Sequence, residues 1–334
     1  MDCQKNTLAQ KQKIRDTEQM KLIPNLVTLL VALSFAGPCF ASIDPVKTLT
    51  LREKLILLER KQTGKTDHFL FDLPVTYNKK VSRWIAYFQD NGKSYFRDWL
   101  EKSSKYMPTI QSELKRSGLP MDLAYMVMIE SGFSTTAISS AQAVGPWQFI
   151  SSTGKNYGLK QNYWLDERRD LTKSTRAAIS YLKDLHQEFG SWWLVAASYN
   201  MGEGGLRRQI KKHGTKDYWE LVRKRALPQE TQDYVPKILA AMMIAKAPNL
   251  YGFRNLEPMS PLQTETVLAP ANTDLESLAD FLSVTRKSIK DMNSELILGY
   301  VPKSVATHSI RVPKGATRYA LEFFRDQNKK LALE

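Results

Sequence analysis

The sequence predicts a mainly α-helical protein with a small β-α-α-β unit near its C-terminal end. Apolar residues recur at helical spacing through much of residues 44–250. Signals for strands are scarce over residues 121–250. After a stretch that carries Gly252, Pro258 and Pro261, the pattern changes to short segments of both kinds.

Size and composition fit one core domain with smaller parts attached. The chain has 334 residues, and its 43% hydrophobic and 25% charged shares are ordinary for a globular protein that buries a sizeable core. Its formal net charge of +14 would attract nucleic acid, anionic lipid or an anionic polymer. Because no nucleic-acid-binding motif is present, we expect no nucleic-acid partner.

Residues 1–41 are typical of an export signal. Lys21 precedes the short apolar run 26–36, and small residues around Ala41 offer a cleavage point before Ser42. The run is too short for a comfortable membrane span. We expect an exported, periplasmic protein whose translation starts at Met20.

Lipidation at Cys39 is the second interpretation of this segment. Cys3 and Cys39 are the two cysteines of the chain, and neither is a good candidate for a structural disulfide or a metal site. Cys39 follows Ala36-Gly37-Pro38, which resembles a lipoprotein box, but the proline departs from that pattern. An uncleaved N-terminal anchor ranks third.

A helical extension is predicted over residues 42–115. Its helix over Val81–Phe88 is followed by a turn at Asn91-Gly92. Two further amphipathic stretches, Tyr95–Met107 and Ile110–Leu114, complete the extension.

Residues 116–250 are predicted to form the main domain. Leu123–Ile129 is apolar on nearly every face, so this helix should be buried. The other helices expected here are Arg176–Phe189, Trp192–Tyr199, Leu206–Lys212 and Tyr234–Ala245.

A linker over 251–263 leads to the β-α-α-β unit at 264–315, and residues 316–334 follow as a tail. The segments expected in this unit are a strand at Thr264–Leu268, helices at Asp274–Phe281 and Thr285–Met292, and a closing strand at Ser309–Pro313.

Glu130 is the candidate catalytic residue. A carboxyl at the end of a buried helix is poorly solvated, which disfavours its charged form and should raise its pKa. A proton donor to a glycosidic oxygen needs that property at neutral pH. An isolated glutamate at this place would more often cap the helix or pair with an arginine, so the interpretation depends on its neighbours.

The neighbours form four motifs, in the order Glu130-Ser131, Gly145-Pro146-Trp147-Gln148, Ala197-Ser198-Tyr199-Asn200 and Glu230-Thr231-Gln232-Asp233-Tyr234-Val235. As a set they resemble the lytic transglycosylases with a lysozyme-like fold, most closely the membrane-bound type D branch, over about residues 80–250. Ser198 replaces an alanine of the family pattern. Pro146 and Trp147 fill a turn where Leu-Met is common, and we expect them to reshape the wall of the sugar groove.

The resemblance implies a peptidoglycan lytic transglycosylase that cuts the MurNAc-β-1,4-GlcNAc bond without water and leaves 1,6-anhydro-MurNAc ends. Glu130 would protonate the leaving oxygen and then take the proton of the C6 hydroxyl of the same muramic acid. Substrate-binding roles would fall to Ser139, near the acetamido group, and to Gln148, Tyr199, Asn200 and Tyr234. Both tyrosines would lie near Glu130 and orient it by hydrogen bonding.

The expected partners are glycan strands of peptidoglycan, bound by a monomer without metal or cofactor. His186 and His213 lack partners at metal-ligand spacing. The acidic cluster Asp166–Asp170 is interpreted as a salt-bridged loop that fixes neighbouring helices.

Two other functions stay open. A hydrolytic muramidase like goose-type lysozyme shares this fold but needs a second acid to activate water, and none can be assigned from the sequence. A non-catalytic wall-binding protein is the other.

The C-terminal unit resembles a degenerate LysM module, a glycan-binding fold. Asn272-Thr273-Asp274 stands where the usual Gly-Asp-Thr opening would be. A purely structural appendage is the alternative. From the linker, we expect that residues 264–315 can be removed without loss of the catalytic chemistry.

Overall fold

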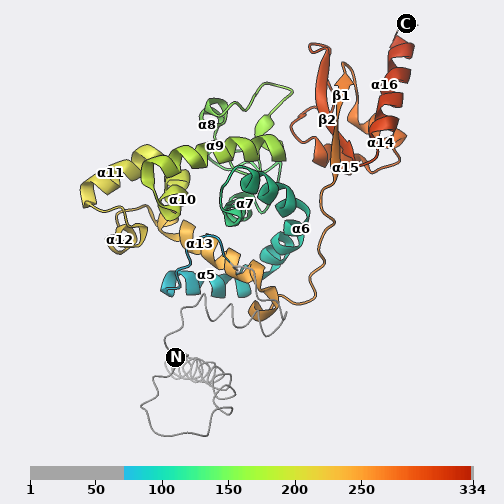
Figure 1. Ribbon diagram of the computed structural model, residues 1–334. Coiled ribbons are helices and arrows are strands. Elements are labelled where there is room, and N and C mark those ends of the chain that lie inside the picture. Colours follow the sequence, from blue (N-terminus) through green and yellow to red (C-terminus); the bar gives the residue numbers. More distant parts are fainter. Residues whose placement is uncertain (1–70, 332–334) are drawn as a thin grey trace, which may run out of the picture. The chain divides into compact units, whose positions relative to one another are not determined.

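The computed structural model describes residues 71–331 (Figure 1). The predicted export signal, both cysteines and the first part of the predicted extension lie outside the described residues. The described part is mainly α-helical, as predicted. The elements up to residue 251 are α5 (Lys79–Gln89), α6 (Lys93–Arg116), η2 (Met121–Ala124), α7 (Tyr125–Ser131), α8 (Ser151–Asn156), η3 (Glu167–Arg169), α9 (Leu171–Phe189), α10 (Trp192–Met201), α11 (Glu203–His213), α12 (Tyr218–Arg223), α13 (Gln229–Lys246) and η4 (Pro248–Tyr251).

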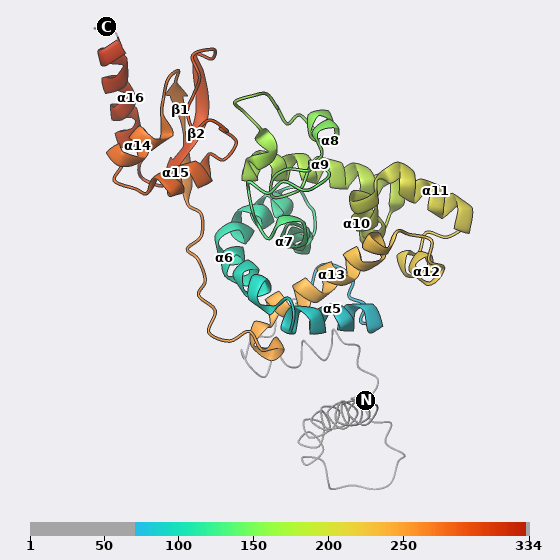
Figure 2. The same ribbon diagram turned by 180° about the vertical axis from the view of Figure 1, so that it is seen from behind.

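Helix α7 lies at the centre of this part, inside a ring formed by α6, α9, α10 and α13 (Figures 1 and 2). Met126, Val127 and Met128 are buried, in agreement with the apolar run in the sequence. Helix α13 is buried along most of its length as well. The central position of α7 brings its C-terminal end, which carries Glu130, among residues from several surrounding elements.

Helix α6 joins two stretches that the sequence analysis treated as separate. It continues through Pro108, although a proline inside a helix removes a backbone hydrogen bond and costs about 3 kcal/mol. Met107, Ile110 and Leu114, at helical spacing on both sides of the proline, are buried against the core. Burial of this common face offsets the loss.

The β-α-α-β order of the C-terminal unit is confirmed. Strand β1 (Thr264–Pro270) pairs antiparallel with β2 (Thr307–Pro313), with Val267 opposite Ile310. The two helices between the strands are α14 (Leu275–Phe281) and α15 (Arg286–Met292).

The expected tail at 316–334 contains a helix, α16 (Thr317–Leu331). Ala320 and Phe324, one helical turn apart, are buried in the apolar core of the C-terminal unit. The unit therefore includes α16, because its core needs a cover that the four predicted segments do not supply.

The C-terminal unit packs against the segment that precedes α9. Trp164 and Leu165 belong to its apolar core. The Asp166 amide donates to the Glu295 carbonyl at 2.8 Å, and the Ile297 amide donates to the Trp164 carbonyl at 2.9 Å. These contacts join the unit to the main domain in addition to the linker.

An ion pair strengthens this contact. The Arg311 guanidinium donates to both carboxylate oxygens of Asp170 at 2.7 Å, and Asp170 is 1% exposed. Asp170 also caps α9 by accepting the Lys173 amide at 2.8 Å. Deletion of the C-terminal unit would expose Trp164 and Leu165 and leave Asp170 without its cation. These contacts argue against the expectation that residues 264–315 can be removed without loss of the catalytic chemistry, which stays a prediction.

Arg311→Met tests the strength of the contact. Removing one partner of a buried ion pair costs about 3–5 kcal/mol. We expect the free energy of unfolding, measured by urea titration, to fall by about 3 kcal/mol. Arg286→Met is the matched control, because Arg286 forms exposed ion pairs with Asp280 and Glu276, which solvent screens. Equal losses in both variants would show that the Arg311–Asp170 pair adds little.

Candidate active site

Glu130 lies in the last turn of α7, immediately before a tight backbone approach. Gly132 ends the helix with a φ of +55°, and a Cβ atom there would lie 2.0 Å from Nε1 of Trp99. Only glycine fits this position without displacing the indole ring. The end of α7 is thereby held against α6.

Tyr234 of α13 contacts Glu130 directly. Its hydroxyl donates a hydrogen bond to Oε1 of Glu130 at 2.5 Å, and the tyrosine is buried. Burial and the negative charge of Glu130 raise the pKa of Tyr234 well above its ordinary value, so the phenol stays protonated and remains a donor. The structure thus places Tyr234 where the sequence analysis expected it.

Burial raises the pKa of the Glu130 carboxyl to about 7. The hydrogen bond from Tyr234 favours the ionised form and opposes this effect. Two further charges act on the carboxyl: Glu230 raises its pKa and Lys237 lowers it. A carboxyl with this pKa exchanges a proton readily near neutral pH, as a general acid or base must.

The loop that follows α7 is locked beside Glu130 by a close contact. Gly145 has a φ of +85°, and a Cβ atom there would lie 1.9 Å from the carbonyl oxygen of Arg168. Ser131 donates from its hydroxyl to the Pro146 carbonyl at 2.9 Å. The Glu-Ser pair and the Gly-x-x-Gln turn of the sequence therefore touch each other.

The Gln148 side chain forms hydrogen bonds that hold this turn. Its side-chain amide donates to the carbonyls of Gly145 at 2.8 Å and Ala137 at 3.3 Å, and its φ is +49°. Ser139 lies in the same loop, where its hydroxyl accepts the Ala143 amide at 3.1 Å. Both side chains are partly exposed, so each can hold the loop and still offer a polar group to a ligand.

The expectation that Pro146 and Trp147 shape the groove wall is wrong. Trp147 is 0% exposed, and its indole nitrogen donates to the Thr175 hydroxyl of α9 at 2.9 Å. Pro146 is buried too. The indole fills the core beneath the turn, because its large apolar area gains more from burial than from lining a polar cleft.

Tyr199 and Asn200 of α10 have partners other than Glu130. The Tyr199 hydroxyl donates to the Trp147 carbonyl at 2.6 Å, and this bond helps to hold the Gly-x-x-Gln turn. The charge of Glu130 nevertheless contributes to raising the pKa of Tyr199. Asn200 accepts the Thr231 hydroxyl at 2.7 Å and so ties α10 to α13, the helix that carries Tyr234.

The acidic cluster Asp166–Asp170 is structural, as expected. The Arg168 guanidinium forms two hydrogen bonds with the Asp166 carboxylate, at 2.9 and 2.7 Å. It also donates to the carbonyls of Phe149 at 3.1 Å and Gln142 at 3.3 Å. This segment therefore clamps the loop that carries Gln148.

Lys237 is a site residue that the sequence analysis missed. It lies one helical turn after Tyr234 on α13, and its ammonium group lies 4.6 Å from the ring centre of Trp84. The helical spacing of three residues from Tyr234 is the signal that could have identified it.

Residues 107–222 match the family described as "Transglycosylase SLT domain". Over this range the chain is similar in sequence to transglycosylase SLT domains. This confirms the family resemblance derived from the four motifs. Glu130, Ser139, Gln148, Tyr199 and Asn200 lie inside the matched range, while Tyr234 lies beyond it.

Two curated relatives are similar in sequence to parts of this chain. Membrane-bound lytic murein transglycosylase D of Escherichia coli (strain K12) is 37% identical over 207 residues, which are 60% of this chain and 45% of the relative. A protein of Alteromonas sp. (strain M-1), named for tributyltin chloride resistance, is 36% identical over 115 residues, which are 34% of this chain and 56% of the relative. The chain thus spans about half the length of the curated relatives it matches.

Solved structures of two lytic transglycosylases are similar to about half of the chain. An inactive mutant of Slt from Pseudomonas aeruginosa aligns with 46% of this chain and 24% of its own, at 22% identity and a TM-score of 0.36. The 70 kDa soluble lytic transglycosylase of Escherichia coli aligns with 52% of this chain and 31% of its own, at 20% identity and a TM-score of 0.38.

Tyr234→Phe tests the hydrogen bond to Glu130. Without the donated proton the ionised carboxylate loses stabilisation, so we expect the pKa of Glu130 to rise above its wild-type value of about 7. The titration can be followed by carbon NMR of the labelled carboxyl. Tyr157→Phe, which removes a hydroxyl that donates to Asp184, is the control and should leave the Glu130 titration in place. An unchanged pKa in Tyr234→Phe would mean that the bond does not act on the carboxyl.

Glu130→Gln should stabilise the fold at alkaline pH. The pKa of Glu130 is raised on folding, so between its ordinary value and about 7 the folded state binds more protons than the unfolded state. Wild-type stability therefore falls as pH rises through this window, whereas the variant does not titrate there. We expect urea unfolding to show a more stable variant at pH 8 and equal stabilities near pH 4; a gain that is independent of pH would contradict the assignment.

Proposed function

We propose that this protein is a peptidoglycan lytic transglycosylase that cuts the MurNAc-β-1,4-GlcNAc bond and leaves 1,6-anhydro-MurNAc ends. The observation that carries this proposal is the Glu130 carboxyl, which has a pKa of about 7 and is oriented by Tyr234 within an SLT domain. The printed name of the Escherichia coli relative, a lytic murein transglycosylase, supports the same reaction class.

One carboxyl suffices for this reaction. Protonated Glu130 gives its proton to the oxygen that leaves the muramic acid, and the glycosidic bond breaks. The resulting carboxylate takes the proton of the C6 hydroxyl of that sugar while the C6 oxygen bonds to the anomeric carbon. Glu130 ends protonated, no water is consumed, and a pKa near neutrality serves both proton transfers.

Hydrolysis is the alternative reaction at the same bond. It requires a second carboxylate that activates water. Glu230 is the acid whose charge acts on Glu130, but it lies on the exposed first turn of α13. Product analysis separates the two reactions, and an absence of products would favour a non-catalytic wall-binding protein.

The loop and helix residues around Glu130 are proposed to hold the sugars. Ser139 and Gln148 present partly exposed polar groups from the locked loop. Asn200 ties α10 to α13, and Tyr199 holds the backbone of the Gly-x-x-Gln turn. The LysM-like C-terminal unit would add glycan contacts of its own.

We place the activity outside the cytoplasmic membrane. The export signal over 1–41 supports a periplasmic protein, and Cys39 offers a lipid anchor as the alternative. The Escherichia coli relative is named as membrane-bound. Among residues 71–331, none of the helices has the length and apolar character that crossing a membrane requires. We propose that the protein acts as a monomer.

Glu130→Gln should abolish cleavage of purified sacculi. The amide keeps the shape of the side chain but transfers no proton, and general acid–base catalysis contributes typically about 10²–10⁴-fold. Release of soluble muropeptides is measured by chromatography and mass spectrometry. Glu188→Gln, which alters an exposed glutamate paired with Arg207, is the control and should cut at the wild-type rate.

Digestion in heavy-oxygen water identifies the reaction of the wild-type protein. A transglycosylase leaves anhydro ends without the label, whereas a hydrolase incorporates the label into reducing ends. Labelled reducing ends that disappear in Glu230→Gln would replace the proposal with the hydrolytic mechanism. Near-normal release by Glu130→Gln would remove Glu130 from the reaction.

A further inference from the structure

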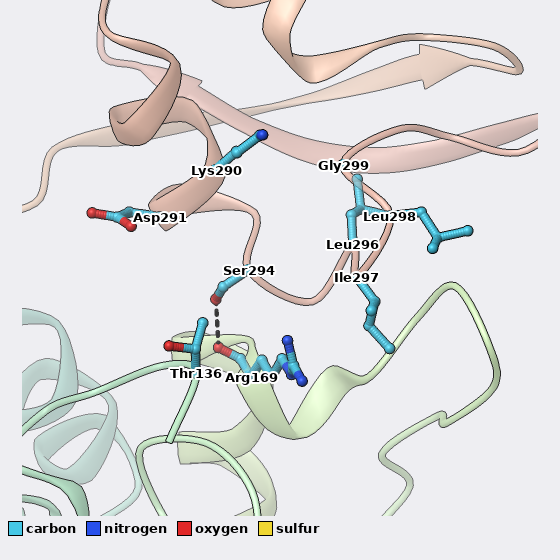
Figure 3. Close-up of a pocket in the computed structure, with 9 residues that line it drawn as sticks. All are labelled: Thr136, Arg169, Lys290, Asp291, Ser294, Leu296, Ile297, Leu298 and Gly299. Carbon is cyan, nitrogen blue, oxygen red and sulfur yellow. Dashed lines mark hydrogen bonds between the residues drawn. The ribbon is translucent and has the colours of Figure 1, made fainter. Parts of the chain in front are cut away.

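A cavity of about 210 Å³ lies where the C-terminal unit meets the main domain (Figure 3). Its walls come from the loop after α7, from η3, from the end of α15 and from the segment between α15 and β2. The lining residues are Thr136, Arg169, Lys290, Asp291, Ser294, Leu296, Ile297, Leu298 and Gly299. None of the motifs in the sequence accounts for this cavity.

Arg169 supplies a cation without a partner to the cavity. Its Nε atom is buried and has no hydrogen-bond acceptor, and no ion pair within residues 71–331 includes its guanidinium. The adjacent Arg168 is fully engaged with Asp166 and two carbonyls. A buried donor that lacks an acceptor costs free energy, which a bound anion would recover.

The other charged groups of the cavity are already paired. Lys290 forms an ion pair with Glu276, and Asp291 pairs with Lys287 at 2.7 Å. The Ser294 hydroxyl donates to the backbone carbonyl of Arg169 at 2.9 Å, which fixes the floor of the cavity (Figure 3). Among the charged residues that line the cavity, Arg169 is therefore the one that forms no ion pair with a described residue.

One wall of the cavity is apolar. Ile297 and Leu298 are 41% and 44% exposed, and the Ile297 backbone is held by its hydrogen bond to the Trp164 carbonyl. The volume is below the range of about 300–1,000 Å³ that drug-sized ligands occupy. A fitting ligand is thus small, with one anionic group and a short aliphatic part.

The cavity adjoins the loop that carries a proposed sugar-binding residue. Thr136 lies six positions after Glu130 and three before Ser139, and its side chain is exposed. The segment that supplies Arg169 also clamps this loop through Arg168. A ligand attached to a glycan bound at Ser139 would extend from the same loop.

We propose that this cavity binds a carboxylate of the peptides attached to the substrate glycan, with Arg169 as its main contact and Thr136 as a second donor. This inference rests on the proposed function. Peptidoglycan peptides combine carboxylates with short aliphatic side chains, which is the chemistry that the cavity offers. Bare strands keep a carboxylate only on the lactyl group next to the sugar, whereas peptide-bearing strands carry their carboxylates further along the peptide. The site would distinguish the two by reach, because only the more distant carboxylate would form the charge-assisted hydrogen bond to Arg169.

The test measures binding without cleavage, in the full chain with Glu130→Gln as background. Two probes are compared: glycan strands that carry peptides, and the same strands after an amidase has removed the peptides. We expect tighter binding of the peptide-bearing strands. Adding Arg169→Met should weaken that binding about tenfold and change the affinity for bare strands less than about twofold.

Arg318→Met is the matched control, since it removes one exposed positive charge from α16, away from the residues that line the cavity. It should leave the preference for peptide-bearing strands intact. Thr136→Val, which removes only a hydroxyl from an exposed side chain, should also weaken binding of peptide-bearing strands alone. This second variant tests the site even if Arg169→Met unfolds.

Equal binding of both probes by the background protein would overturn the inference, as would equal losses for both probes in Arg169→Met. Either result leaves the proposed function standing if the wild-type protein still cuts sacculi. Conversely, a preference for peptide-bearing strands in the background protein, together with a wild-type protein that cuts neither probe, would support the cavity and overturn the proposed function.

Discussion

The ion pair between Arg168 and Asp166 holds together the parts of the molecule on which the site depends. Both side chains are buried, and burying an ion pair costs free energy unless the remaining donors of the guanidinium also find acceptors. The carbonyls of Gln142 and Phe149 accept hydrogen bonds from the Arg168 guanidinium. These bonds attach the loop that carries Ser139 and Gln148 to Arg168. The backbone of Arg168 also fills the space beside Gly145 where a side chain would otherwise lie.

This clamp connects the C-terminal unit to the candidate site. Asp166 uses its carboxylate for Arg168 and its backbone amide for Glu295, while Asp170 pairs with Arg311. The same short segment therefore faces the sugar loop on one side and the C-terminal unit on the other. A ligand that settles at Arg169 would contact the segment that also sets the position of the loop.

The electrostatics at Glu130 follow from competition between burial and hydrogen bonding. Burial alone would keep the carboxyl neutral, whereas the Tyr234 hydroxyl and the Lys237 charge favour the ionised form. The result is a pKa of about 7, between the values that a buried and a solvated carboxyl would have. The protein accepts a poorly solvated acid at the end of its central helix, which costs stability whenever that acid is ionised.

The local pattern of apolar and polar residues was sufficient to predict the helical class, the buried helix α7 and the β-α-α-β order. It also predicted the structural role of the Asp166–Asp170 cluster. Each of these depends on periodicity or composition within one segment. Sequence also singled out Glu130 and Tyr234, which lie 104 positions apart and meet through a hydrogen bond. Their meeting was expected from the family resemblance, since no local pattern links two segments so distant in the chain.

The orientation of side chains was decided by the tertiary structure alone. Trp147 sits in a motif beside Gln148, yet its indole points into the core because Thr175 and the apolar interior lie on that side. Tyr199 donates to the Trp147 carbonyl and not to Glu130. The Nε atom of Arg169 is buried without an acceptor beside a cavity that residues of the C-terminal unit line. Periodicity records which face of an element is apolar, but which polar group meets which partner depends on segments that only folding brings together.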